Sequence, residues 1–333
     1  MSFLLCALCS ILIYNFINRQ KPIASLAILP FRCAGNDLEL ISSGEILAES
    51  ALIKLHMLKS LTLRSPISTS QYRGTNKTLR TIRKELNVSY LVDGRIRREG
   101  DKILIFVDLV DAKEKELWAK EFSWENDQIS GITSEITRNL AFWCNAGPSP
   151  EELIKIDSDP TKNSNAYLKY ISANVISNDA FSSVTGSALT DSSGFRKAVS
   201  DYDNAIKYDP DFAQAYARRA IVLAWGYKTG QFDASYIKKC REDIDKALKI
   251  NKDLTEAQIA LGFYYYYCEI DYQKALVHFN RAAIKEPENY QPLFYMALVY
   301  RKTGDWGKSQ NLISRVILQN PQVALFLTNI GKS

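Results

Sequence analysis

Side chains that could carry out catalysis are few and far apart in this sequence. The chain has 2 histidines, His56 and His278, which lie far from each other along the chain. A Ser-His-Asp triad or a histidine-rich metal site therefore has almost no material from which to form. The sequence also has no P-loop, GxSxG, HExxH or glycine-rich dinucleotide turn. We predict a protein that is not an enzyme, with no catalytic, metal-binding or cofactor-binding residues and no cofactor.

The cysteines do not indicate a structural framework of disulfides. Six of them are too few for such a framework in a chain of 333 residues. Cys6 and Cys9 belong to an apolar run, and the spacing of the other four contains no CxxC motif, so we expect buried thiols. If the folded part lies outside the cytoplasm, Cys33 and Cys144 are the first pair to test for a disulfide, because they flank one predicted domain.

Positive and negative charges nearly balance, with 42 Lys and Arg against 37 Asp and Glu. This small excess gives no electrostatic footprint for nucleic acid, so we predict that the chain binds none directly. One basic cluster contains Lys77, Arg80, Arg83, Lys84, Arg95, Arg97 and Arg98. It is either a site for phosphate or an anionic polymer, or a solvated helix face with the outer side of a strand. The alternation of Arg95 and Arg97 with Ile96 favours the second interpretation.

The chain opens with an apolar run, residues 3–17, that contains no charge. As a helix this run would be roughly 22 Å long, shorter than the roughly 30 Å hydrocarbon core of a membrane. A membrane anchor, a cleaved signal peptide and a buried core helix are the alternatives. We favour an anchor at 1–21 that contacts the membrane through residues 3–17, because a polar exit ending in Pro22 follows the run.

The segment 22–147 has the pattern of an α/β domain. Short apolar runs bounded by turn residues indicate strands, and apolar residues three to five positions apart indicate helices. Gly100 lies in a short loop between two strand-like runs, which predicts a hairpin. The expected order is β-α-β-α-β-β-β-α, a mixed sheet with helices packed on it. The expected strands are 25–31, 61–64, 90–98, 102–110 and 116–122, and the expected helices are 46–58, 78–86 and 129–143.

Three stretches of this segment resemble the TolB amino-terminal-like domain. They are LAILPF at 26–31, RSPISTSQYRG at 64–74, and ELNVSYLVDGRIRREGDKILIFVDLVDAKEKELWAKEF at 85–122. That domain occurs in bacterial membrane-anchored regulators and in some adenylate cyclases, where it precedes tetratricopeptide repeats. The resemblance implies a sensory or scaffolding domain and brings no catalytic residue. It also implies a single-pass protein of the inner membrane whose soluble part is periplasmic.

Self-similar helix patterns fill the segment 165–333. Small and large residues recur with steps of four, three and five, and each set follows a partner helix with its own small residue. Pro287 and Pro321 are 34 residues apart, the period of the tetratricopeptide repeat. We predict four repeats and the start of a fifth, joined to the α/β domain by a linker at 148–164. The sets are Ala198, Tyr202, Ala205, Pro210; Cys240, Ile244, Ala247, Lys252; Ala275, Phe279, Ala282, Pro287; and Ser309, Ile313, Val316, Pro321.

Two departures from the repeat pattern and one boundary lead to further expectations. Arg219 occupies a position that is usually apolar in these repeats. The serine-rich segment 177–194 interrupts the first repeat, and we expect it to be a mobile insertion. The boundary with Pro148 and Pro150 is rich in turn residues, so few contacts should cross it and the two parts should fold independently.

A partner-binding surface is expected on the inward side of the opening helices of the repeats. The candidate residues are Phe263, Tyr266, Phe294, Leu298 and Arg301. We predict a non-enzymatic, membrane-anchored sensor or scaffold that binds a protein or peptide partner through its repeats. The alternative is the extracytoplasmic sensory part of a transmembrane transcriptional regulator or adenylate cyclase that lacks its output domain. The predicted fold class is an α/β mixed-sheet domain followed by an all-α tetratricopeptide-repeat solenoid.

Overall fold

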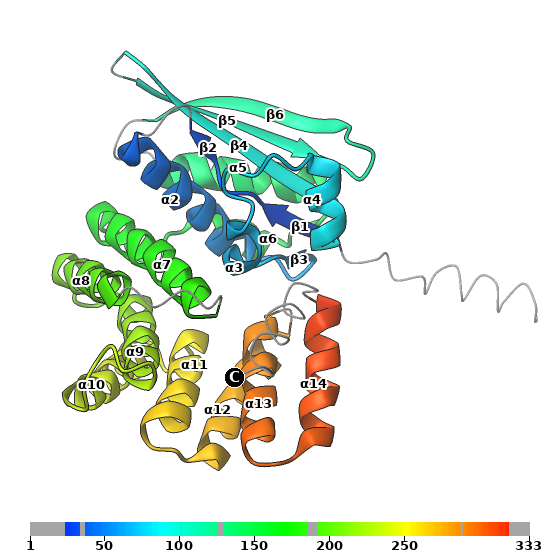
Figure 1. Ribbon diagram of the computed structural model, residues 1–333. Coiled ribbons are helices and arrows are strands. Elements are labelled where there is room, and N and C mark those ends of the chain that lie inside the picture. Colours follow the sequence, from blue (N-terminus) through cyan, green and yellow to red (C-terminus); the bar gives the residue numbers. More distant parts are fainter. Residues whose placement is uncertain are drawn as a thin grey trace, which may run out of the picture.

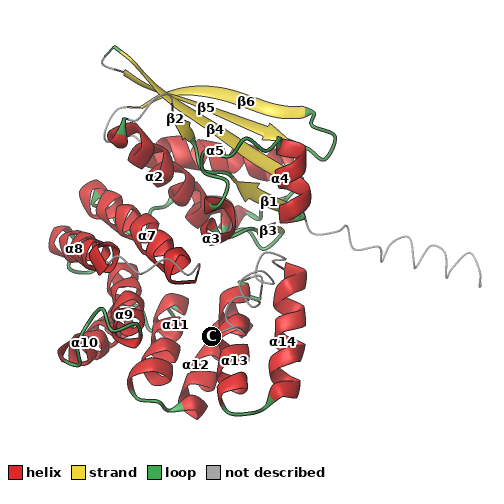
Figure 2. Cartoon of the chain, in the orientation of Figure 1, coloured by secondary structure: helices red, strands yellow, loops and turns green. Residues whose placement is uncertain are grey.

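The computed structural model describes residues 24–33, 37–100, 102–124, 129–185, 192–287 and 289–319. A mixed sheet with its helices forms one part of the molecule, and an arc of helices forms the other (Figure 1). The strands gather in a single layer, and the arc is entirely helical (Figure 2). The predicted fold class, an α/β mixed-sheet domain followed by a solenoid of helical repeats, is therefore confirmed.

The elements of the α/β part follow the predicted order, with two short additions. The additions are the strand β2 (Arg32–Cys33) and the helix α3 (Pro66–Ser70). The other strands are β1 (Ala24–Ile28), β3 (Leu61–Leu63), β4 (Tyr90–Glu99), β5 (Lys102–Val110) and β6 (Glu116–Trp124). The other helices are α2 (Leu38–Leu55), α4 (Leu79–Leu86) and α5 (Ile129–Trp143).

The sheet has the strand order β3-β1-β4-β5-β6, and β2 also pairs with β4. Strand β1 is parallel to both of its neighbours, so that Leu26 lies opposite Leu63 on one side and Tyr90 on the other. Strands β4, β5 and β6 form an antiparallel meander. Gly100 has a φ of +60° in the turn after β4 and supplies the left-handed conformation that the predicted hairpin needs.

The Asp-Gly step in β4 allows a close approach between a side chain and the sheet. A Cβ atom on Gly94 would lie 2.1 Å from the ring of Phe31, so this position accepts no side chain without rearrangement. Asp93 is buried and forms an ion pair with Arg32 on the adjacent β2. Phe31 can therefore pack directly on the strand backbone, which anchors the segment between β1 and α2.

The helical part consists of consecutive antiparallel pairs. The pairs are α7 (Ser164–Thr185) with α8 (Ser192–Tyr208), α9 (Ala213–Lys228) with α10 (Ser235–Ile250), α11 (Thr255–Phe263) and η1 (Tyr264–Cys268) with α12 (Tyr272–Lys285), and α13 (Tyr290–Lys302) with α14 (Trp306–Gln319). The η1 segment continues α11 as a π-helix. Within the described ranges these pairs correspond to the four predicted repeats, and the expected start of a fifth lies outside them.

Small residues hold the two helices of each pair close together. In the second repeat the Cys240 thiol lies 3.3 Å from the carbonyl oxygen of Ala220, and in the fourth the Ser309 hydroxyl donates to the Ala297 carbonyl at 2.9 Å. In the third repeat, a Cβ atom on Gly262 would lie 2.3 Å from the Phe279 ring. Ala220, Gly262 and Ala297 occupy corresponding positions of the opening helices, and these contacts explain why the sequence keeps small residues there.

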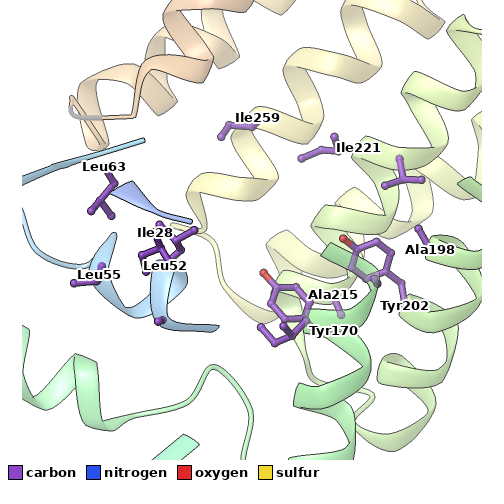
Figure 3. Close-up of a cluster of buried hydrophobic side chains, with 14 of the residues drawn as sticks. Ile28, Leu52, Leu55, Leu63, Tyr170, Ala198, Tyr202, Ala215, Ile221 and Ile259 are labelled. Carbon is purple, nitrogen blue, oxygen red and sulfur yellow. The ribbon is translucent and has the colours of Figure 1, made fainter. Parts of the chain in front are cut away.

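The two parts of the molecule share a hydrophobic core, so the expectation of few contacts across the boundary is wrong. The expected linker contains a helix, α6 (Pro150–Asp157), and its Ile156 is fully buried. The ammonium group of Lys54 on α2 donates to the Ile156 carbonyl at 2.9 Å and to Asp159 Oδ1 at 2.8 Å. Helix α2 also packs on α7. Figure 3 shows Leu52 of α2 in the same cluster as Tyr170 of α7.

Two further expectations are revised, and the open question of a Cys33–Cys144 disulfide is addressed. Helix α7 continues to Thr185, so the first half of the expected insertion 177–194 is helical. Within the described ranges, Cys33 and Cys144 form no disulfide with each other. No helix in these ranges has the length and apolar character needed to cross a membrane. The predicted single-pass location in the inner membrane is therefore corrected, and residues 3–17, on which it depended, lie outside the described residues.

Candidate functional site

The five predicted partner-binding residues fall into two groups in the structure. Phe263, Phe294 and Leu298 are buried between helices, with exposed fractions of 2%, 7% and 8%. Tyr266 and Arg301 are partly exposed. The charge of Arg301 reaches the Tyr266 hydroxyl, which places these two side chains near each other on η1 and α13. Only this second group can contact a partner without repacking the core.

An aromatic row connects the opening helices of the second, third and fourth repeats. The Trp225 ring of α9 lies 5.3 Å from the Tyr267 ring of η1, and the Phe263 ring of α11 lies 4.4 Å from the Tyr295 ring of α13. The Tyr266 ring extends this row beside the Tyr267 ring, and the centroids of the two rings are 4.5 Å apart. Tightly packed rings of this kind give the arc a rigid inner wall.

A polar cluster on α7, α8 and α9 extends this wall toward the first repeat. Arg218 donates through Nε to Asn174 Oδ1 at 3.2 Å, and the Tyr202 hydroxyl donates to the same oxygen at 2.6 Å. Burial raises the pKa of Tyr170 and of Tyr202, so both hydroxyls stay protonated at neutral pH. Arg218, Trp225, Tyr266, Tyr295 and Arg301 are partly exposed, and we call the wall that they form the inner surface. Asn174 is buried and supports this surface through Arg218.

Helix α2 of the α/β part faces the inner surface. The Asn178 amide of α7 lies 3.4 Å from the Glu49 carboxylate of α2. His56, which caps the end of α2, is close enough to Arg218 and Glu286 for both charges to affect its pKa, and desolvation is the larger effect and lowers that pKa. The repeats therefore curve around the end of α2, as their arrangement in Figure 1 also shows.

A buried ion pair explains why an arginine occupies position 219, which is usually apolar in these repeats. Its guanidinium donates to Asp243 through Nε at 2.8 Å and through Nη2 at 2.6 Å, and Nη1 pairs with Asp203. Arg219 and Asp243 are 7% and 4% exposed. Because both partners are buried and the contact is bidentate, the pair links α9 firmly to α10.

The basic cluster of the α/β part shows the features of a solvated surface. Five of its members pair with carboxylates: Lys77 with Glu85, Arg80 with Glu114, Arg95 with Asp108, Arg97 with Glu99 and Arg98 with Glu39. Arg95 and Arg97 lie over the exposed part of the Phe106 ring, at 5.5 and 5.1 Å from its centroid. These contacts favour the interpretation of a solvated face over that of an anion site.

A shallow depression of about 570 Å³ on α5 and α6 is a weaker candidate site. Three charged residues line it: Arg138 and Asp157 pair with each other, and Glu135 pairs with Lys120. The Ser134 hydroxyl donates to the Ile156 carbonyl at 3.0 Å and so supports the packing of α6. Among the described residues, no group of three or more His, Cys, Asp or Glu could hold a metal ion. The inner surface is the better candidate because it spans several repeats.

Sequence reasoning missed Arg218 and Tyr295, although a pattern pointed to them. Each precedes the small residue of its repeat, Ala220 or Ala297, by two positions. Residues two positions before the small residue lie on the same helix face as residues four positions further along. The predicted surface used other positions of these helices and therefore did not include Arg218 or Tyr295. Asn174 was missed because the first repeat lacks a clear pattern.

Comparison with known protein families gives a match for the α/β part. Residues 22–138 match the second domain of the HilA/YgeH-like transcriptional regulators. A putative adenylate cyclase 3 of Rhizobium meliloti (strain 1021) is 26% identical over 117 residues, which make up 35% of this chain and 20% of that cyclase. The chain thus matches about a fifth of the length of this curated relative. The resemblance to the TolB amino-terminal-like domain is not confirmed by these matches.

Three solved structures have a weak overall similarity to this chain. A MamA RS-1 ArsTM double mutant and MamA 41-end from Desulfovibrio magneticus RS-1 are 17% and 16% identical; each match covers 56% of this chain and 93% or 94% of the other, with TM-scores of 0.32 and 0.33. YrrB, described as a TPR protein with an unusual peptide-binding site, is 15% identical over 61% of this chain and 89% of its own, with a TM-score of 0.33. These overall similarities are low, so the repeat architecture rests on the helix pairs described above.

Proposed function

We propose that this chain is a non-catalytic scaffold that binds a protein or peptide segment along the inner surface of its repeats. The observation that carries the proposal is the continuity of this surface from Arg218 on α9 to Arg301 on α13. Partly exposed side chains on three successive opening helices contribute to it, with Arg218 at one end and aromatic rings along the rest. An extended segment could contact several repeats at once, which is how solenoids use their concave faces.

The chemistry of the inner surface suits a polypeptide partner. Arg218 carries five N–H donors in a fixed fork, and Asn174 and Tyr202 are its hydrogen-bond partners within the chain. Burial raises the pKa of Tyr266 to about 12 and that of Tyr295 further, so these hydroxyls are neutral and can donate to carbonyl oxygens. Aromatic rings and arginines are the residues that most often dominate binding energy at protein interfaces.

A peptide-display selection on the immobilised full chain would test this proposal. The affinity of a selected peptide would then be measured for the wild type and for Tyr266→Ala and Arg301→Ala, which change partly exposed residues of the inner surface. We expect each variant to bind about tenfold more weakly, the effect of about 1.4 kcal/mol. Lys238→Ala is the matched control, because this side chain on α10 is 85% exposed. Equal affinity for the inner-surface variants and the wild type would contradict the proposal.

A second candidate function follows from the matches of the α/β part. We propose that residues 22–138 act as the regulatory module of a signalling protein, with the repeats as its input. The support is that a regulator family and an adenylate cyclase both match this part of the chain. The test exchanges the matched segment of the Rhizobium meliloti cyclase for residues 22–138 and measures cyclic AMP in cells without a cyclase. Loss of cyclic AMP from a soluble chimera would contradict this candidate.

A further inference from the structure

Two cysteines from neighbouring repeats meet at the outer end of the third repeat. Cys240 lies on α10 of the second repeat and is fully buried. Cys268 is the last residue of η1 in the third repeat and is partly exposed. Helix α10 packs on η1, and the two thiols lie close enough for each to shift the pKa of the other. The Cys240 sulfur also lies 3.3 Å from the Ala220 carbonyl oxygen. No sequence motif predicts this pair, because 27 residues lie between Cys240 and Cys268.

The backbone at Cys268 departs from that of the fourth repeat by one inserted residue. From Gly262 to Asp271 there are nine steps, whereas the corresponding interval from Ala297 to Asp305 has eight. The structure accommodates the extra residue as a π-helical turn, in which the Glu269 amide donates to the Tyr264 carbonyl five positions earlier at 3.1 Å. π-Helical insertions of this kind are frequent at functional sites.

The turn after Cys268 is held in a conformation that its residues do not favour. Ile270 has a φ of +56°, and the equivalent position in the fourth repeat is Gly304, with a φ of +83°. A β-branched residue in the left-handed region is an outlier that surrounding structure must enforce. The insertion and this turn together fix Cys268 beside α10.

The pKa values of the two thiols are shifted in opposite directions, so one member of the pair ionises more readily than the other. The hydrogen bond from Cys240 lowers the pKa of Cys268, and the same bond together with burial raises the pKa of Cys240. Burial raises the pKa of Cys144 to about 12 and also raises that of Cys33. Because the thiolate is the reactive form, Cys268 is the most reactive of the four cysteines that the structure describes.

We propose that Cys240 and Cys268 form a reversible redox pair whose disulfide locks the second repeat to the third. With a peroxide as oxidant, the Cys268 thiolate attacks the O–O bond, which gives a sulfenic acid and hydroxide. The Cys240 sulfur then attacks the sulfenic sulfur, and the S–O bond breaks with the release of water. Overall two thiols and one hydrogen peroxide give one disulfide and two waters, and a dithiol reductant restores the thiols.

Peptide mapping of the full chain tests the pair. Reduced protein is treated with a small excess of hydrogen peroxide, its remaining thiols are alkylated, and a tryptic digest is analysed without reduction. We expect a cross-linked peptide containing Cys240 and Cys268 in most of the protein, which disappears after dithiothreitol. Mapping separates this bond from any that involves another cysteine. The variant with Cys33→Ser and Cys144→Ser is the matched control and should give the same cross-link.

Two variants separate the roles of the cysteines. In Cys268→Ser the cross-link should be absent and Cys240 should stay reduced, whereas in Cys240→Ser the Cys268 sulfenic acid should persist and react with dimedone. A wild-type protein that accumulates sulfenic acid on Cys268 without the cross-link would overturn the proposal, as would a disulfide from Cys268 to a second molecule. These readouts are independent of any partner that the inner surface binds.

Discussion

The Tyr290 hydroxyl donates a hydrogen bond to the Ser65 hydroxyl oxygen at 3.0 Å, although 225 positions separate the two residues. Tyr290 begins α13 of the fourth repeat, and Ser65 caps the N-terminus of α3 in the α/β part. At the other end of the arc, α7 packs on α2 and α3. The arc of repeats therefore contacts the α/β part at both ends, through α7 and through α13. The two contacts close a ring, and the inner surface faces α2 inside it.

The closing contact predicts a local loss of stability in Tyr290→Phe. Removing the hydroxyl deletes one hydrogen bond, whose net worth is typically about 0.5–1.5 kcal/mol. Hydrogen exchange should become faster at the start of α13 and in α3, while α9 and α10 keep their protection. Tyr300→Phe is the control on the same helix, since its ring contacts Lys308 and should keep that contact without the hydroxyl. Equal exchange in both variants would mean that the hydrogen bond does not hold the arc closed.

The close approach at Gly262 predicts overpacking in Gly262→Ala. The new methyl group would lie 2.3 Å from the Phe279 ring, so helices α11 and α12 would have to separate. We expect the free energy of unfolding to fall by about 1–3 kcal/mol in chemical denaturation. Gly307→Ala on α14 is the matched control, because no atom of another element lies within 4 Å of the position that its methyl group would take, and alanine favours a helix. A larger loss in the control than in Gly262→Ala would refute this account.

The buried pair of Arg219 and Asp243 predicts a large loss in Arg219→Leu. The substitution leaves Asp243, which is 4% exposed, without its bidentate partner. Breaking a buried pair in this way typically costs about 3–5 kcal/mol. The double variant Arg219→Leu and Asp243→Leu should recover most of that loss, because no uncompensated charge remains.

Lys238→Ala serves as the control for the ion pair, since its partner Glu242 and the lysine itself are both exposed. We expect a change below about 0.5 kcal/mol in this variant. The free energies of unfolding of all four proteins would be compared by urea denaturation at one pH. A double variant as unstable as Arg219→Leu would show that the position needs a polar contact for another reason.

The repeats were predictable because their packing rule leaves a periodic trace in the sequence. Cys240 and Ser309 are small because each faces the small residue of a partner helix, and the steps of four and three follow from helix geometry. Arg219 appeared as an exception because its partner Asp243 lies on the next helix, and pairing across helices has no fixed spacing.

The relation between the two parts could not be predicted from local patterns. The buried contacts of Lys54 with Ile156 and Asp159 join residues about a hundred positions apart, and no periodicity records them. The boundary with Pro148 and Pro150 resembled a linker because proline is common in turns. Proline is also favoured at the first position of a helix, and Pro150 begins α6 in this way. The closing contact of Tyr290 with Ser65 was likewise invisible, and with it the fact that α2 faces the inner surface.

Acid should weaken the folded state through His56, which lies where α2 meets the inner surface. The His56 side chain is exposed, but the repeats around it partly desolvate its ring and lower its pKa below the ordinary value of 6.5, with Arg218 lowering it further and Glu286 opposing. The unfolded chain therefore binds a proton more readily than the folded chain between the folded pKa and 6.5. The free energy of unfolding should fall as the pH drops from 6.5 through the folded pKa, and the loss should be smaller in His56→Gln.

His278 supplies the matched control for this pH effect, because the chain has 2 histidines and both have lowered pKa values. Its ring stacks on Tyr265 and its Nδ1 donates to Gln258 Oε1 at 2.9 Å, away from the inner surface. The free energies of unfolding of the wild type and both single variants would be measured at pH 7.0 and 5.5, which bracket the range in which histidine titrates. Each histidine should contribute separately to the loss of stability in acid. Hydrogen exchange distinguishes their locations: acid should expose the end of α2 through His56 and the third repeat through His278. If His56→Gln loses as much stability in acid as the wild type, His56 is not desolvated by the repeats that surround the end of α2.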